Sequence, residues 1–126
     1  MQIHINPGDE LPIYRQIMRQ ITDAIAGSRL VAGEQLPSHR DLAEQLVIAP
    51  LTVKKAYDEL EREGLLSTQR GRGTFISEKP AEVSLAERRE RLRDAAQRLL
   101  SQAALSRVPF ADVVSLLKEI DKGMKS

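Results

Sequence analysis

The sequence predicts a mainly α-helical chain with one small β-hairpin. Apolar residues recur at helical spacing in five separate segments, and prolines, glycines or short polar stretches separate these segments. Two short runs, residues 65–69 and 74–77, flank a glycine-containing turn at residues 70–73, as the strands of a hairpin do. With 41% hydrophobic and 29% charged residues, the 126-residue chain has the composition of a globular protein.

The N-terminal segment predicts an extended arm followed by a first helix. The arm occupies residues 1–10 and contains a turn at Pro7-Gly8. Isoleucines at every fourth position from Ile13 to Ile25 then mark one face of an amphipathic helix. Gly27 follows the last of them, where a helix stop is expected.

Two shorter helices and the hairpin come next. Ser38 is a favourable N-cap and predicts a helix of about two turns, which the segment VIAP interrupts. Pro50 suits the first position of the following helix, and Gly64 terminates that helix. Its inward face is expected to consist of Val53, Ala56, Tyr57 and Leu60. Three helices, with a short turn between the second and the third, followed by a β-hairpin form a winged helix-turn-helix.

A polar stretch at residues 78–82 is the expected domain boundary, between a winged helix-turn-helix domain over residues 1–78 and a helical tail over residues 79–126. Ser84 and Glu87 form a capping box near the start of the tail. Residues 106–109 separate two tail helices, whose apolar stripes are too broad to be buried within one chain. The tail is therefore expected to form a symmetrical dimer. The residues expected at the dimer interface are Leu85, Leu92, Ala96, Leu99, Ala103, Phe110, Val113, Val114 and Leu117.

Several classes of function lack their residues. The chain has no cysteine, which removes disulfides, thiolate nucleophiles and cysteine-based zinc sites. His4 and His39 lie on different elements, and neither a phosphate-binding loop nor an acid–base pair at a recognisable spacing is present. We therefore expect no catalytic residue, metal or cofactor. No apolar run approaches the roughly 18–20 residues that span a bilayer, and a secretory signal is absent, so a cytoplasmic protein without membrane contact is expected.

The distribution of charge is more informative than the net charge of +1. Between Ser38 and Phe75 the six basic and six acidic residues cancel. The basic residues lie mostly near the starts of helices and in the hairpin turn, whereas four of the acids lie late in the third helix. This separation predicts a positive surface at the leading end of the third helix, as phosphate contacts require.

The sequence LPSHRDLAEQLVIAPLTVKKAYDELEREGLLSTQRGRGTFI resembles the GntR family of bacterial regulators, and the resemblance covers residues 11–76. It is carried by the LPS-x-R turn, the TV-x-x-AY-x-x-LE helix and the G-x-GTF hairpin. The resemblance implies a transcription regulator whose partner is double-stranded operator DNA. The short tail resembles that of the YtrA-type subfamily, whose members dimerise through it and often control ABC-type transporter genes.

The family's contact positions can be transferred to matching residues of this chain. Many members carry a Ser-Arg or Thr-Arg pair where this chain has Ala49-Pro50, so base reading must depend more on Arg40, Leu51 and the residues after it. Leu51 or the Thr52 methyl group could contact a thymine methyl group. The positions expected to contact DNA are Ser38, Arg40, Pro50, Leu51, Thr52, Lys54, Lys55, Arg70, Gly71, Arg72, Gly73 and Thr74.

The leading functional hypothesis is a dimeric repressor that binds a palindromic operator. A different class of function stays open, namely a winged-helix module that binds another protein and has no affinity for DNA. An unknown small-molecule effector would act at the dimer interface or at a hinge near Pro80. The sequence indicates neither the operator nor the regulated genes, and it does not separate a repressor from an activator.

Overall fold

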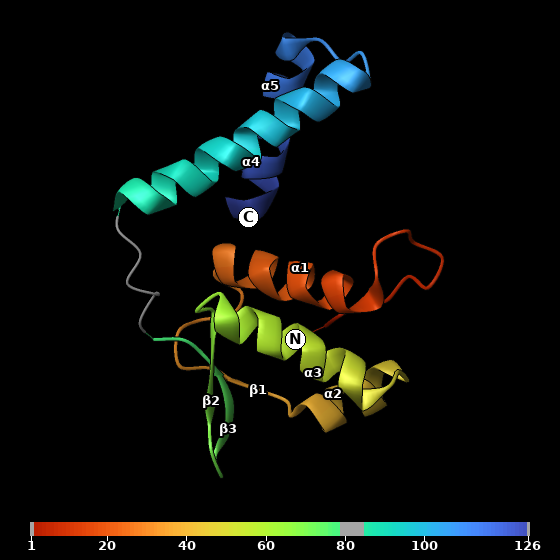
Figure 1. Cartoon of the computed structure of the whole chain (residues 1–126), viewed down its shortest axis with the longest axis vertical. Coiled ribbons are helices and arrows are strands. Elements are labelled where there is room, and N and C mark those ends of the chain that lie inside the picture. The colour runs from red at the N-terminus through yellow and green to blue at the C-terminus, as the bar shows by residue number, and fades with distance from the viewer. Residues whose placement is uncertain (1, 79–84, 126) are drawn as a thin grey trace. The chain divides into compact units, whose positions relative to one another are not determined.

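The computed structural model describes residues 2–78 and 85–125. The chain divides into two compact units, residues 1–81 and 82–126. In the described residues, the first unit contains three helices and three strands, and the second contains two helices (Figure 1). Three predictions depend on residues 79–84 and lie outside the described residues. They are the domain boundary after residue 78, the Ser84 half of the capping box and the hinge near Pro80.

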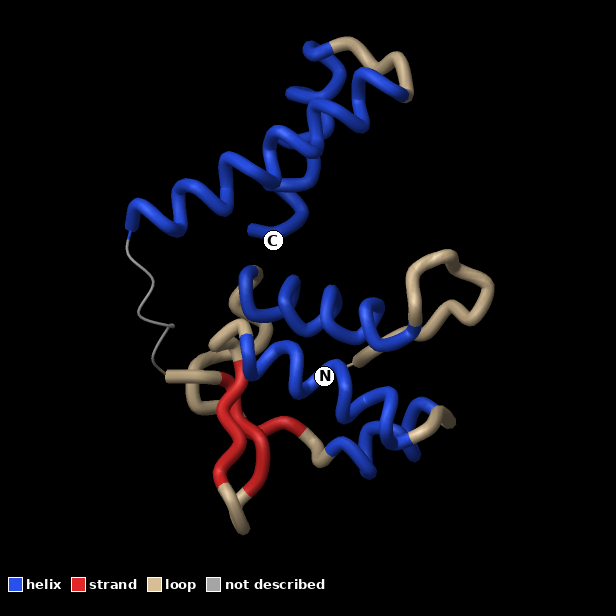
Figure 2. Tube along the Cα trace, in the orientation of Figure 1, coloured by secondary structure: helices blue, strands red, loops and turns tan. Residues whose placement is uncertain are grey.

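The elements of the first unit confirm the predicted winged helix-turn-helix. Its strands form one antiparallel sheet in the order β1-β3-β2, and the β2–β3 hairpin projects from the helices (Figure 2). Strand β1 was not predicted, because only two residues form it. The elements are α1 (Ile13–Ala26), β1 (Gln35–Leu36), α2 (His39–Leu46), α3 (Pro50–Arg62), β2 (Leu66–Gln69) and β3 (Gly73–Ile76).

One apolar core holds these elements together. Ile17 and Ile21 from the isoleucine face of α1 are completely buried, whereas Ile13 and Ile25 at its ends are only partly buried. All four side chains predicted for the inward face of α3 are buried. Each strand adds one buried aliphatic residue to the same core, namely Leu36, Leu66 and Ile76. Burial of each such side chain contributes about 1.5–3 kcal/mol, which fixes α2 and α3 against α1 and the sheet.

The ends of α2 and α3 follow the signals in the sequence, with one departure. The Ser38 hydroxyl caps α2 by accepting a hydrogen bond from the Asp41 backbone N–H at 3.0 Å. Helix α3 begins at Pro50 as expected, and the chain turns at Gly64 with φ of 80°. The departure is Val47, which ends α2 in the left-handed conformation with φ of 56°. A β-branched residue is strained there, and glycine or asparagine is the usual occupant.

The second unit is a pair of helices, α4 (Leu85–Leu105) and α5 (Phe110–Lys125), that contact each other. Val113 is only 3% exposed, and Leu99, Ala103 and Val114 are partly buried. Part of the stripe expected at a dimer interface is therefore covered within this unit. The rest is exposed, namely Leu92, Ala96, Phe110 and Leu117, and the Leu85 side chain lies outside the described residues. No helix among the described residues is long and apolar enough to cross a membrane.

Candidate nucleic-acid interface

A concave surface lies between the hairpin and the start of α2. Residues 35–39, Asp41 and residues 68–74 line it, and we call it the wing–α2 concavity. Half of the predicted DNA-contact positions lie on this surface, although they come from segments some 30 residues apart in the sequence. These positions are Ser38, Arg70, Gly71, Arg72, Gly73 and Thr74.

The turn at the tip of the hairpin is held by two interactions. Within the turn, the Arg72 backbone N–H donates to the Gln69 carbonyl at 2.9 Å, and Gly71 and Gly73 adopt positive φ values of 77° and 128°. From β1, the Gln35 side-chain amide donates to the Arg72 carbonyl at 3.0 Å. The φ of Gly73 favours glycine, and a Cβ atom at this position would lie 2.6 Å from the Gln35 Nε2 atom, so the Gln35 side chain would have to leave its place. The sequence pattern did not indicate a role for Gln35, because it did not indicate the two-residue strand β1 to which Gln35 belongs.

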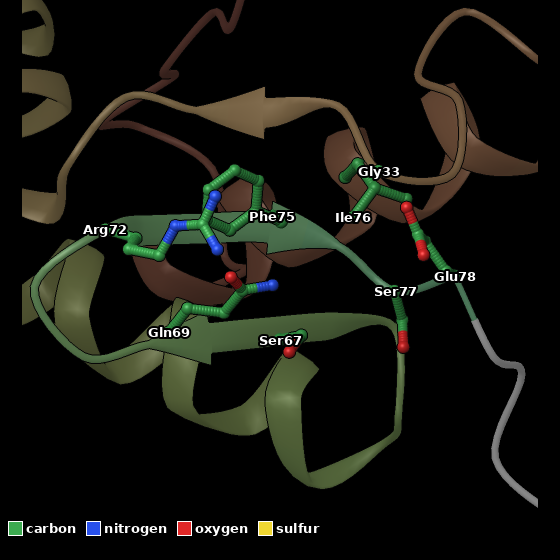
Figure 3. Close-up of a pocket in the computed structure, with 8 residues that line it drawn as sticks. All are labelled: Gly33, Ser67, Gln69, Arg72, Phe75, Ile76, Ser77 and Glu78. Atoms are coloured by element: carbon green, nitrogen blue, oxygen red, sulfur yellow. The ribbon is translucent and has the colours of Figure 1, made fainter.

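The two arginines of the hairpin turn are presented differently. Arg70 lines the wing–α2 concavity only. Arg72 also lines a pocket on the outer face of the sheet, together with Gln69, Ser67 and Phe75. Figure 3 shows the Arg72 side chain lying back along the sheet on the side that carries Phe75. Both arginines therefore line the concavity that the hairpin turn shares with the start of α2, and Arg72 lines the second pocket as well.

The first turn of α2 places side chains of both charges at this concavity, because Asp41 lines it and Arg40 is the residue before Asp41. Arg40 is exposed in that turn, next to the Ser38 cap. The N-terminal end of a helix carries unpaired backbone N–H groups and a partial positive charge, which favour phosphate. His39 lines the concavity as well and was not predicted; its place between the cap and Arg40 was the signal available in the sequence.

The leading part of α3 is less cationic than the sequence suggested. The Lys54 ammonium group lies 2.8 Å from the Asp58 carboxylate, one helical turn later. The Lys55 ammonium group lies 4.2 Å from the centre of the Tyr14 ring, as in a cation–π contact. Both lysines thus have partners within the chain. The exposed ion pair is worth only about 0.3–0.5 kcal/mol, so a DNA phosphate can displace it.

Tyr57 joins α3 to the segment that leads into α2. Its hydroxyl donates a hydrogen bond of 2.8 Å to the Pro37 carbonyl, next to the Ser38 cap. Burial raises the pKa of Tyr57 well above the ordinary value for a phenol, so the ring stays neutral. Tyr57 therefore helps to position the start of α2 against α3.

In the described part of the chain, no three His, Asp or Glu residues gather as a metal site requires.

The chain is similar to known transcription regulators. The family profile "Bacterial regulatory proteins, gntR family" matches residues 13–76. The chain is 36% identical over 123 residues to the HTH-type transcriptional repressor YtrA of Bacillus subtilis. The matched region covers 98% of this chain and 95% of that relative.

Solved structures show the same similarity. The crystal structure titled transcriptional antiterminator from Listeria monocytogenes matches with a TM-score of 0.88 at 28% identity, over 100% of this chain and 94% of that one. The DNA-binding domain of AraR, crystallised in complex with operator ORX1, matches with a TM-score of 0.53 at 28% identity. That match covers 60% of this chain and 93% of that one.

Proposed function

The chain belongs to the GntR family of bacterial regulatory proteins, and we propose that it is a dimeric, cytoplasmic repressor that binds a near-palindromic operator in double-stranded DNA. The observation that carries this proposal is the wing–α2 concavity, where the hairpin turn brings Arg70, Gly71 and Arg72 together with Ser38 at the capped start of α2. Such a surface fits the sugar-phosphate backbone beside a groove.

In this proposal the helices α2 and α3 and the β2–β3 hairpin contact the DNA. Helix α3 enters the major groove with its first turns, because a single α-helix fits that groove and reads base edges from its N-terminal end. The start of α2 contacts one phosphate strand and holds Arg40 toward a base edge in the groove, and Arg70 and Arg72 contact the backbone or the adjacent minor groove. The AraR domain, of similar fold, was crystallised on its operator, which supports this placement.

The exposed apolar residues of the tail support a dimer. Leu92 is 71% exposed and Phe110 is 69% exposed, and Leu117 and Ile120 are about half exposed on α5. Large apolar side chains gathered on two helices favour a protein–protein contact. A two-fold dimer would present two copies of α3 to two half-sites, roughly one or two helical turns apart. The operator is then an inverted repeat.

Fluorescence anisotropy tests this proposal with duplexes that tile the region upstream of the protein's own gene. We expect one duplex to bind with a Kd of about 10⁻⁸–10⁻⁹ M, much more tightly than a scrambled duplex, and affinity to fall steeply with salt. Arg40→Ala is expected to weaken binding by about 1–3 kcal/mol. Arg62→Ala, at the far end of α3, is the matched control and should leave affinity unchanged.

The exposed arginines at the concavity favour DNA over the alternative of a protein-interaction module. The outcome that contradicts the proposal is the absence of binding to every upstream duplex at low salt by a folded protein. That result would favour the module instead. Equal loss of affinity for operator and scrambled DNA in Arg40→Ala would move Arg40 from the bases to the phosphate backbone.

A further inference from the structure

The first turn of α3 presents an almost entirely apolar surface. Ala49 caps the helix without a side-chain hydrogen bond, and Pro50, the first helical residue, has no N–H group to donate. Leu51 follows and is 76% exposed. From Ala49 to Val53, Thr52 carries the one side chain that can form a hydrogen bond, and Thr52 is half-buried. The part of α3 that leads into a groove is therefore aliphatic.

The next polar side chains of α3 are already engaged. Lys54 is paired with Asp58 at 2.8 Å, and Lys55 lies against the Tyr14 ring. To reach a base edge, each lysine would have to leave a partner within the chain. Both are also long point charges, which suit phosphate better than a base edge that needs two fixed hydrogen bonds. Leu51 can approach the groove without breaking any contact between polar groups.

The major groove offers one apolar group to an aliphatic side chain. Every base edge there presents a hydrogen-bond donor, an acceptor or both, and thymine alone among the four bases adds a methyl group at C5. Packing of a leucine on a donor or acceptor would leave that polar group without water and without a partner, which is unfavourable. Packing on the methyl group removes apolar surface of both partners from water.

From this we infer that Leu51, with the Thr52 methyl group beside it, selects thymine in each half-site by packing on the thymine 5-methyl group. The inference rests on the proposed function, because it assumes that α3 enters the major groove. It assigns base recognition at this position to apolar contact rather than to hydrogen bonding. The recognised chemical class is a 5-methylpyrimidine. Deoxyuridine pairs with adenine in the same way as thymidine but lacks the methyl group.

The size of the effect follows from the area involved. Burial of one methyl-sized group contributes about 0.8 kcal/mol, which corresponds to about a fourfold change in Kd. A dimer on two half-sites uses two such contacts. Removal of both methyl groups is therefore expected to weaken binding about 15-fold, provided that the contacts are independent.

Fluorescence anisotropy on the operator and on the same duplex with every thymine replaced by deoxyuridine tests this inference. Wild-type protein should bind the deoxyuridine duplex about 15-fold more weakly. Leu51→Ala should bind the thymine duplex about as weakly as wild type binds the deoxyuridine duplex, and should discriminate between the two duplexes less than twofold. Val31→Ala, another exposed aliphatic residue of the same unit, is the matched control and should keep the full discrimination.

Three results would overturn the inference. Equal affinity of wild type for both duplexes would show that no methyl group is read. Full discrimination in a folded Leu51→Ala variant would show that another residue reads the methyl groups. The third result comes from duplexes in which one thymine at a time is replaced by deoxyuridine. A loss of affinity spread evenly over all positions, instead of concentrated at symmetrical positions, would indicate an effect on DNA shape. Failure of the proposed function is distinct, because wild type would then bind neither duplex selectively.

Discussion

Replacement of Val47 by glycine should stabilise this protein, although the side chain removed is an aliphatic one. Val47 holds φ of 56° at the end of α2 and is 89% exposed. A left-handed conformation costs a residue other than glycine about 1–2 kcal/mol. Because the Val47 side chain is exposed, its burial offsets little of this cost. Glycine adds conformational freedom to the unfolded chain, which offsets about 0.4–1 kcal/mol. The net gain is therefore about 0.5–1 kcal/mol.

Thermal unfolding followed by circular dichroism measures this gain. A change of that size corresponds to a rise in Tm of about 3–6 °C for a domain of this length. Val31→Gly is the matched control, because Val31 is exposed but is not among the described residues with positive φ. That variant should melt at or below the wild-type temperature. A Val47→Gly protein that melts no higher than wild type would refute the argument from backbone strain.

Three other substitutions test the interface and its supports. Gln35→Ala should weaken operator binding several-fold in anisotropy while Tm stays nearly constant, because it releases the hairpin turn without emptying the core. Asp58→Asn frees Lys54 for phosphate, so it should raise affinity for scrambled DNA and steepen the salt dependence by about one unit. Tyr57→Phe should lower the unfolding free energy by about 0.5–1.5 kcal/mol at neutral pH. Because burial raises the pKa of Tyr57, its contribution is constant below about pH 10 and is lost above it. Urea unfolding should show a steeper decline with pH in wild type than in this variant.

The helices of the first unit could be predicted because local signals and burial agree in them. The isoleucine face of α1, the Ser38 cap and the inward face of α3 each combine a spacing with an end signal, and the structure confirms all three. Strand β1 carries no such signal. Gln35 and Leu36 are a strand only because Phe75 and Thr74 of β3 pair with them, and pairing between distant segments leaves no periodicity in two residues.

The charge of the candidate interface shows a second limit. The Lys54–Asp58 pair lies at a spacing of four residues on one helix, so the sequence contained the signal for it. The contact of Lys55 with Tyr14 joins α3 to α1, and only the packing of the two helices brings these residues together. In the tail, the spacing of apolar residues identified the face but not its partner. The structure shows that Val113 is buried within the chain, whereas Phe110 is exposed.

A hydroxyl-radical footprint on the operator tests most directly whether two copies of α3 read DNA together. A two-fold dimer should give two protected patches of equal extent, related by symmetry, with centres about 10–10.5 base pairs or a multiple of that distance apart. Arg40→Ala should weaken both patches equally. A single patch, or uniform protection without symmetry, would contradict the central claim.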